Sequence, residues 1–318
     1  MARTSDVATL VSQAREGQPR AVARLISLVE DASPQLREVM AALQPFTGHA
    51  HVVGITGAPG VGKSTSTSAL VGALRAQGKR VGVLAIDPSS PFSGGALLGD
   101  RIRMQEHATD PGVYIRSMAS RGHLGGLSWS TPQALRVLDA AGCDVIILET
   151  VGVGQSEIEV VGVADTVLVL LAPGMGDGIQ AAKAGILEIG DVFVVNKADR
   201  DGASATSREL RHMISLADRP EGAWRPPVLK TIASQGEGIP KVVDEIAAHF
   251  AWASEAGELT KRRERRAADE IEAIALAALR SRMADLGSNE LLHDLATQVV
   301  QGSTDPYVAA DQLIATLD

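Results

Sequence analysis

Cysteine, aromatic residues and long apolar runs are all scarce in this chain of 318 residues. Its single cysteine, Cys143, cannot form an internal disulfide, which favours a reducing compartment. Aromatic residues make up only 3% of the chain, too few for a surface that stacks single-stranded nucleic acid. A net charge of −8 argues further against nucleic acid and anionic lipid as partners.

Signals for secretion or membrane insertion are also missing. The opening residues, MARTSDVATL, contain no apolar signal core, and the most apolar stretch, 160–172, is interrupted by Asp165 and too short to cross a bilayer. The seven histidines form no H-x-x-H cluster, so with one cysteine no soft-metal site is expected. We therefore expect a cytoplasmic protein with no membrane and no nucleic-acid partner.

The chain does contain a regular alternation of apolar runs and helical segments. Apolar residues account for 45% of it, enough to bury a core. Nearly continuous apolar runs are typical of parallel strands covered on both faces, and they occur at 52–55, 80–86, 144–148, 166–171 and 192–195, with a shorter run at 227–231. Helical stretches such as 64–76 lie between them. This alternation predicts an α/β fold with a doubly wound, mostly parallel sheet over residues 47–252.

Helical patterns flank the alternating region on both sides. Residues 1–46 carry apolar side chains at helical spacing, and the pair Ser33-Pro34 resembles a helix start. A long helical stretch covers 258–282, and a second helical region follows Ser288. We predict an N-terminal helical extension, 1–46, and a C-terminal helical segment, 253–318. The basic block at 261–266 is either a solvated helix face or a contact with an acidic partner or a second copy.

A phosphate-binding loop follows the first strand run. Residues Gly57-Ala58-Pro59-Gly60-Val61-Gly62-Lys63-Ser64 match G-x-x-x-x-G-K-[ST] without a mismatch and open a helical stretch. Such glycines let backbone N–H groups curl round phosphates, and the helix N-terminus adds partial positive charge. The lysine can reach the β and γ phosphates, and the serine hydroxyl can ligate magnesium. This P-loop, through Thr65, is the predicted nucleotide-binding segment.

A second motif, Asn196-Lys197-Ala198-Asp199, follows the strand run 192–195 and suits guanine. The carboxylate of Asp199 can accept hydrogen bonds from both the ring N–H and the exocyclic amine of guanine, a donor pair that adenine lacks. Each charge-assisted bond contributes roughly 1.5–3 kcal/mol. Beyond the next strand run, the backbone N–H of Ala233 could donate to guanine O6. Together with Asn196 and Lys197, these residues predict that the chain binds GTP and GDP.

Three acids stand where a magnesium ion would be held. Asp87 and Glu149 each end a strand run, and Asp100 follows the glycine-rich stretch 93–99. Ligands of an open α/β sheet collect at the carboxyl ends of its strands, where carboxylates can hold magnesium or its waters. A helix cap or a surface acid is the alternative reading of each. We expect the Mg²⁺ site to consist of Ser64, Asp87, Asp100 and Glu149.

The predicted catalytic residues are Lys63, Glu149 and Gln155. Gln155 can orient the attacking water, although it does not directly follow Gly152 as in Ras-type switches. We therefore expect slow intrinsic hydrolysis, in the range of ~10⁻⁴ to 10⁻² per second that is common for unassisted GTPases. Contacts from a partner or a second copy would supply the rest of the acceleration.

Together these motifs resemble the MeaB/ArgK family of P-loop GTPases, to which the methylmalonic aciduria type A protein belongs. The likeness covers nearly the whole chain. Its specific marks are GITGAPGVGKST at 54–65, AIDPSS at 85–90, GGALLGDRIRM at 94–104, ETVGVGQSE at 149–157 and PGMGDGIQ at 173–180, continuing through Lys183. One departure is Ile232, where the family usually has serine before the alanine of the base-side loop.

The resemblance implies a GTPase chaperone of an adenosylcobalamin-dependent acyl-CoA mutase, usually methylmalonyl-CoA mutase. Such a protein gates cofactor loading and protects the mutase, and it is a homodimer joined through C-terminal helices. The resemblance also makes the stretches 89–99 and 173–178 switch loops, with Asp177 and Lys183 as switch residues. Plain connecting loops are the alternative.

Three other functions compete with this reading. A nickel-type metallochaperone GTPase would share the acidic strand end but would need a Cys/His ligand set, which the sequence lacks. A small-molecule kinase would need an acceptor pocket and a lid, and the guanine motif makes ATP use improbable. A helical dimer scaffold with a vestigial nucleotide site conflicts with the intact Lys63, Ser64 and Asp199.

Overall fold

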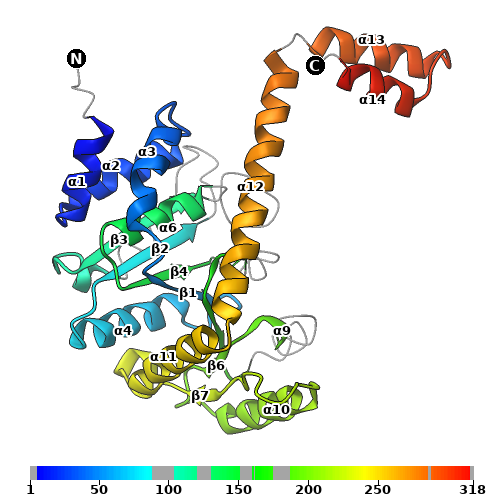
Figure 1. Ribbon diagram of the computed structural model, residues 1–318. Helices are drawn as coiled ribbons and strands as arrows, with labels where there is room; N and C mark the ends of the chain where they lie inside the picture. Colours follow the sequence, from blue (N-terminus) through cyan, green and yellow to red (C-terminus); the bar gives the residue numbers. More distant parts are fainter. Residues whose placement is uncertain are drawn as a thin grey trace. The chain divides into compact units, whose positions relative to one another are not determined.

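Seven parallel strands form the centre of the computed structural model, which describes residues 6–87, 104–119, 130–150, 160, 162–174, 187–285 and 288–315. Within these residues the strand order is β3-β2-β4-β1-β5-β6-β7 (Figure 1), and every neighbouring pair is parallel. The strands are β1 (His51–Thr56), β2 (Val81–Asp87), β3 (Val113–Ala119), β4 (Val145–Glu149), β5 (Thr166–Leu171), β6 (Val192–Val195) and β7 (Val228–Lys230). The predicted doubly wound α/β fold is confirmed.

Helices cover both faces of this sheet (Figure 1). Those on one face are α1 (Val7–Arg15), α2 (Pro19–Glu30), α3 (Leu36–Leu43), α6 (Thr131–Ala140) and α10 (Ala203–Leu216). Those on the other face are α4 (Lys63–Ala76) and α11 (Ile239–Glu255). Short elements complete the described connections: η1 (Gln44–Phe46), η2 (Gln105–His107), α9 (Leu187–Ile189) and η4 (Ala233–Gln235).

Successive residues of the central strands enter different cores. In β1, Val52 belongs to the core that α1, α2, α3 and α6 cover, whereas Val53 and Ile55 belong to the core that α4 and α11 cover. The same alternation occurs in β4, where Ile146 and Ile147 face opposite sides. Because both sides are buried, these strands are continuous apolar runs and show no alternation of apolar and polar residues.

Three aspartates fix the amino edge of the sheet. Each stands directly before a strand and bonds in both directions to one residue at, or directly before, the start of the neighbouring strand: Asp144 with Arg80, Asp165 with Val52, and Asp191 with Val167. The aspartate N–H donates to the partner's carbonyl at 2.8, 2.8 and 2.9 Å, respectively. Its carboxylate accepts the partner's N–H at 2.7, 3.0 and 2.8 Å. These aspartate clamps satisfy amides at the strand starts and hold the strand register.

The chain divides into two compact units, Met1–Leu259 and Thr260–Asp318. The second contains most of α12 (Glu258–Asp285), together with α13 (Ser288–Val300) and α14 (Pro306–Ile314). Asp305 caps α14 by accepting from Tyr307 N and Val308 N, and Leu295 and Ala309 are buried. Helices after residue 258 were expected from the sequence. None of the described helices has the length and apolar character needed to cross a bilayer.

Two local features differ from the sequence prediction. The edge strand β3 has no counterpart among the predicted runs, because Arg116 and Ser117 interrupt its apolar residues. Helix α3 begins at Leu36, two residues after the proline expected to start it. There the Ser33 hydroxyl accepts from Gln35 N at 3.3 Å, so the Ser-Pro pair forms a turn ahead of the helix.

Candidate nucleotide-binding site

The phosphate loop joins the carboxyl end of β1 to the start of α4, and two of its glycines are sterically required. Gly57 has a φ of 145°, and a Cβ there would lie 2.3 Å from the carbonyl oxygen of Leu170. Gly62 has a φ of 97°, and its Cβ would lie 2.5 Å from Asn196 Nδ2. Side chains at either position would therefore push neighbouring strands and loops apart.

Lys63, the first residue of α4, folds its side chain back into this loop. The buried ammonium donates to Gly57 O at 2.6 Å and to Ala58 O at 3.2 Å. Val61 is buried in the core beneath the loop, while Pro59 and Gly60 are exposed, as is Thr65 on the first turn of the helix. A lysine ammonium, a glycine-rich turn and a helix N-terminus thus meet at one place, which suits a polyphosphate.

Glu149 links the end of β4 to α4. It is 4% exposed, and its two carboxylate oxygens accept from Ser64 Oγ at 2.7 Å and from Thr67 Oγ1 at 2.9 Å. The β1–β4 register pairs Glu149 with Ile55, which places the acid beside the strand that leads into the phosphate loop. Two of the four predicted metal residues, Ser64 and Glu149, are therefore in direct contact.

Thr67 is a site residue that the sequence prediction missed. It lies three residues after Ser64, so both hydroxyls project from the same face of α4. Its side chain is fully buried, and its hydroxyl bonds to Glu149. The available signal was the S-x-x-T spacing directly after the lysine, which puts two hydroxyls within reach of one carboxylate.

The other predicted metal, catalytic and switch residues are less completely described. Asp87 ends β2, two residues beyond Ala85, which pairs with Glu149 in the β2–β4 register. Its backbone therefore lies at the same edge of the sheet as Glu149. Predicted residues outside the described part of the chain are Asp100, Gln155, Asp177 and Lys183.

Asn196 ties the base-side loops to the phosphate loop. Its Nδ2 donates to Val61 O at 2.9 Å. Its Oδ1 accepts from Thr231 Oγ1 at 3.1 Å and from the backbone N–H of Ala233 at 3.1 Å. One buried amide thus joins the loops after β1, β6 and β7. The Ala233 amide, expected to meet guanine O6, donates here to Asn196, and its contact with guanine stays a prediction.

The next residues of this loop differ sharply in their contacts. Lys197 has a left-handed φ of 57°, and its ammonium donates to Gly60 O at 2.6 Å, a second link to the phosphate loop. Asp199 is exposed, and its carboxylate makes no hydrogen bond or ion pair with any residue that the structure describes. Its acceptor oxygens are therefore open to a ligand, as reading a guanine base requires.

Known proteins match both the sequence and the fold. A family model described as "Methylmalonyl Co-A mutase-associated GTPase MeaB" matches residues 22–287. A protein of Pyrococcus abyssi is 48% identical over 307 residues, 96% of this chain and 95% of that one. "GTPase ArgK" of Escherichia coli is 37% identical, covering 76% of this chain and 75% of the relative.

Two further matches extend the comparison. The mouse "Methylmalonic aciduria type A homolog, mitochondrial" is 37% identical over 78% of this chain and 64% of its own length. A crystal structure of an LAO/AO transport system kinase superposes with a TM-score of 0.73 at 25% identity, covering 100% of this chain and 99% of that one.

The family match spans well over half of the chain and includes the phosphate loop, Glu149 and the guanine motif. The relatives of Pyrococcus abyssi and Escherichia coli are each named as GTPases. This chain therefore belongs to the methylmalonyl-CoA mutase-associated (MeaB) family of GTPases, binds guanine nucleotide and hydrolyses GTP.

Proposed function

We propose that this GTPase is the chaperone of an adenosylcobalamin-dependent acyl-CoA mutase, methylmalonyl-CoA mutase being the first candidate. In this role it would gate cofactor loading and protect the mutase from inactivation. The observation that carries the proposal is the match over residues 22–287 to a family named for its association with that mutase. The mouse relative, named for methylmalonic aciduria, gives further support.

The phosphate loop and Lys63 would hold the triphosphate. Backbone amides of 57–62 face the bridging oxygens in such a loop, and the Lys63 ammonium neutralises charge at the β and γ phosphates. Asp199 would then accept from the guanine ring N–H and amine, while Asn196 and Lys197 hold the base loop against the phosphate loop. Binding phosphate and base at once depends on these links, because they set the spacing of the two loops.

Ser64 and Glu149 would hold Mg²⁺ or its waters, with Asp87 and Asp100 as further acids. Their donor atoms are hydroxyl and carboxylate oxygens, which this hard cation prefers. The Ser64 hydroxyl donates its hydrogen to Glu149, and a hydroxyl oxygen can also ligate a hard cation. Thr67 holds the second oxygen of the same carboxylate. When bound, the ion neutralises charge on the phosphate oxygens during hydrolysis.

Two further roles rest on the sequence resemblance. We assign Gln155 to orienting the attacking water, with slow turnover in the isolated protein. We assign Asp177 and Lys183 to switch loops that a γ-phosphate orders and hydrolysis releases. A cytoplasmic location also stays a prediction, and cell fractionation would check it.

The chain would act as a homodimer through its C-terminal unit. Helix α12 exposes four large apolar side chains: Ile271 (68%), Ile274 (50%), Leu276 (47%) and Leu279 (47%). Apolar groups gathered on one helix to this extent commonly mark an interface. Light scattering should give twice the chain mass. The variant Ile271→Glu with Leu279→Glu should give a monomer, and a wild-type monomer at micromolar concentration would contradict the dimer.

Measuring GTP hydrolysis with and without the mutase tests the main proposal. We expect methylmalonyl-CoA mutase to stimulate phosphate release and to co-purify differently with GTP and with GDP. Lys63→Ala serves as the control that removes nucleotide-dependent effects. Three results would contradict the proposal: no stimulation and no binding, phosphate transfer to a small acceptor as in a kinase, or delivery of nickel as in a metallochaperone.

A further inference from the structure

A cavity lies at the edge of the sheet opposite the nucleotide loops. It has a volume of about 710 Å³, within the usual range for small-molecule sites. Its residues include His51 at the start of β1 and Val145 at the start of β4. The phosphate and base loops follow the carboxyl ends of strands, so this amino-edge cavity is a separate site.

The interior of the amino-edge cavity is apolar. Helices α4 and α11 pack against each other over one face of the sheet (Figure 1), and the cavity lies between the C-terminal half of α4, the middle of α11 and the strands. The side chains that form this interior are Val53, Ile147, Leu70, Leu74, Val243 and Ile246. All of them belong to the core on the α4 and α11 side, so a ligand there would contact the core directly.

One wall of the cavity is held in place by a buried polar chain. The His51 ring stacks on Phe250 at 4.1 Å between centroids, and its Nε2 lies 2.8 Å from Thr166 Oγ1. The same hydroxyl lies 2.8 Å from His249 Nδ1, and His249 Nε2 lies 3.2 Å from Asp191 Oδ1. The wall is therefore pre-formed, which lowers the ordering cost of binding.

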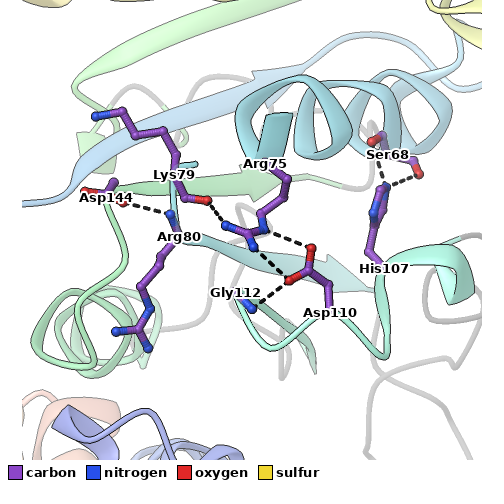
Figure 2. Close-up of polar contacts among 8 residues, drawn as sticks. All are labelled: Ser68, Arg75, Lys79, Arg80, His107, Asp110, Gly112 and Asp144. Atoms are coloured by element: carbon purple, nitrogen blue, oxygen red, sulfur yellow. Dashed lines mark hydrogen bonds and ion pairs between the residues drawn. The ribbon is translucent and has the colours of Figure 1, made fainter. Parts of the chain in front are cut away.

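The acids at the rim are already occupied. Asp139 accepts from the backbone amides of Gly48 at 2.5 Å and Ala50 at 2.9 Å. Asp144 accepts from the amide of Arg80, as Figure 2 shows. Backbone donors thus occupy acceptor positions of each carboxylate, which leaves it fewer hydrogen bonds to offer a cationic ligand.

The basic side chains at the rim, Lys79 and Arg15, have no acidic partner among the described residues. The backbone carbonyl of Lys79 accepts a hydrogen bond from Arg75 Nη1 at 2.6 Å. The Lys79 side chain extends away from that contact (Figure 2). Among the described residues, the Lys79 ammonium has no hydrogen-bond or ion-pair partner. Arg15 lies over the Phe46 ring at 3.6 Å and likewise pairs with no acid there. The rim therefore offers the Lys79 ammonium and the Arg15 guanidinium above an apolar interior.

We propose that the amino-edge cavity binds a medium-chain carboxylic acid or an apolar anion of similar shape. The tail would lie between α4 and α11, and the carboxylate would meet Lys79 and Arg15. Sugar phosphates do not suit the apolar interior, and amines do not suit the rim, because Asp139 and Asp144 are committed to backbone amides. This site is independent of the proposed mutase role.

Calorimetric titration of octanoate into the full chain with GDP bound tests the site. Saturable binding of one octanoate per chain is expected. Acetate, which lacks the tail, and octan-1-ol, which lacks the charge, should each bind at least about tenfold more weakly, because each loses one of the two contacts. Lys79→Gln combined with Arg15→Gln should weaken octanoate about tenfold or more. Lys241→Gln, an exposed lysine of α11 outside the cavity, is the matched control and should change nothing.

A blocking variant gives a second, independent test. Ala247 is an exposed cavity residue of α11, and Ala247→Trp would fill the opening. It should abolish octanoate binding while thermal unfolding and GDP affinity stay at wild-type values. The proposal is overturned if octanoate fails to saturate, if octan-1-ol binds equally well, or if the double variant and Lys241→Gln behave alike. Because nucleotide affinity is measured separately, these outcomes do not depend on the mutase proposal.

Discussion

The two edges of the sheet use acidic residues in opposite ways. At the amino edge, Asp144, Asp165 and Asp191 each bond both ways with one residue at, or directly before, the start of a neighbouring strand. At the carboxyl edge, Asp199 has no such partner among the described residues, and Glu149 accepts from two hydroxyls of α4. Acids before a strand therefore join neighbouring strands here, whereas an acid after a strand contacts the helix of the phosphate loop (Glu149) or is open to a ligand (Asp199).

The contacts at the two edges also differ in what they connect. The aspartate clamps join strands that are already paired in the sheet. The carboxyl-edge contacts, such as Asn196 to Val61 and Lys197 to Gly60, join loops more than a hundred residues apart in sequence. Substitutions at the carboxyl edge should therefore alter nucleotide binding first, and those at the amino edge should alter stability first.

The largest effect is expected at the phosphate loop. Lys63→Ala removes the ammonium that donates into the loop, so GTP hydrolysis should fall at least about 100-fold. The melting temperature should change little, because the lysine contributes no core packing. Phosphate release and thermal unfolding measure the two quantities. Near wild-type hydrolysis by Lys63→Ala would contradict the claim that contacts at the carboxyl edge of the sheet serve the nucleotide.

The amino edge should respond in the reverse manner. Asp165→Ala leaves the Val52 amide without its carboxylate acceptor, which should lower the free energy of unfolding by about 2 kcal/mol. Asp165→Asn keeps one acceptor oxygen and should cost less. Chemical denaturation measures the loss, while GTP affinity should stay within about twofold of the wild type. A variant that loses GTP affinity but keeps its stability would contradict the division between edges.

Thr67 sharpens the comparison, since it lies on α4 yet serves the carboxyl edge. Thr67→Val removes the hydrogen bond from Thr67 to the Glu149 carboxylate, and the Mg²⁺ concentration for half-maximal hydrolysis should rise about tenfold. Thr206→Val is the matched control, because Thr206 is also a buried helical threonine, but within the described part of the chain its hydroxyl bonds to Gly202 O alone. Equal magnesium dependence in the two variants would assign Thr67 a purely structural role.

The smallest effect concerns Cys143 at the amino edge. Burial raises the pKa of this thiol from 9.0 to about 12. A raised pKa stabilises the fold fully below the unfolded value, and that stability is lost as the pH rises from about 9 toward 12. Between pH 8 and pH 10 the wild type should lose about 1 kcal/mol more than Cys143→Ala. Identical pH dependence of the two unfolding free energies would show that the thiol is not protected.

The sequence predicts most strands of the sheet, the phosphate loop and the guanine motif. Five of the apolar runs correspond closely to strands, because burial on both faces demands uninterrupted apolar residues. The phosphate loop and the guanine motif are local in sequence, so Lys63, Ser64 and Asn196 can be assigned without coordinates. Strand β3 is not predicted from the sequence, because Arg116 and Ser117 interrupt its apolar residues.

What depends on tertiary packing could not be predicted. The role of Thr67 requires knowing that β4 ends beside α4, and the link from Asn196 to Val61 requires the β1–β5–β6 order. The amino-edge cavity exists only because α4 and α11 cover the starts of two strands. In the sequence, Asp165 simply interrupts an apolar stretch, although in the fold it clamps β5 to β1.

Nucleotide affinity of Asp199→Asn tests the central claim most directly. The variant loses the charged acceptor for the guanine ring N–H and amine, so GTP should bind roughly 10–100-fold more weakly. Xanthine carries a carbonyl in place of that amine, and the asparagine amide can donate to it, so the triphosphate of xanthosine should bind more tightly than to the wild type. Unchanged GTP affinity, with no gain for xanthosine triphosphate, would contradict the assignment of Asp199 as the base reader.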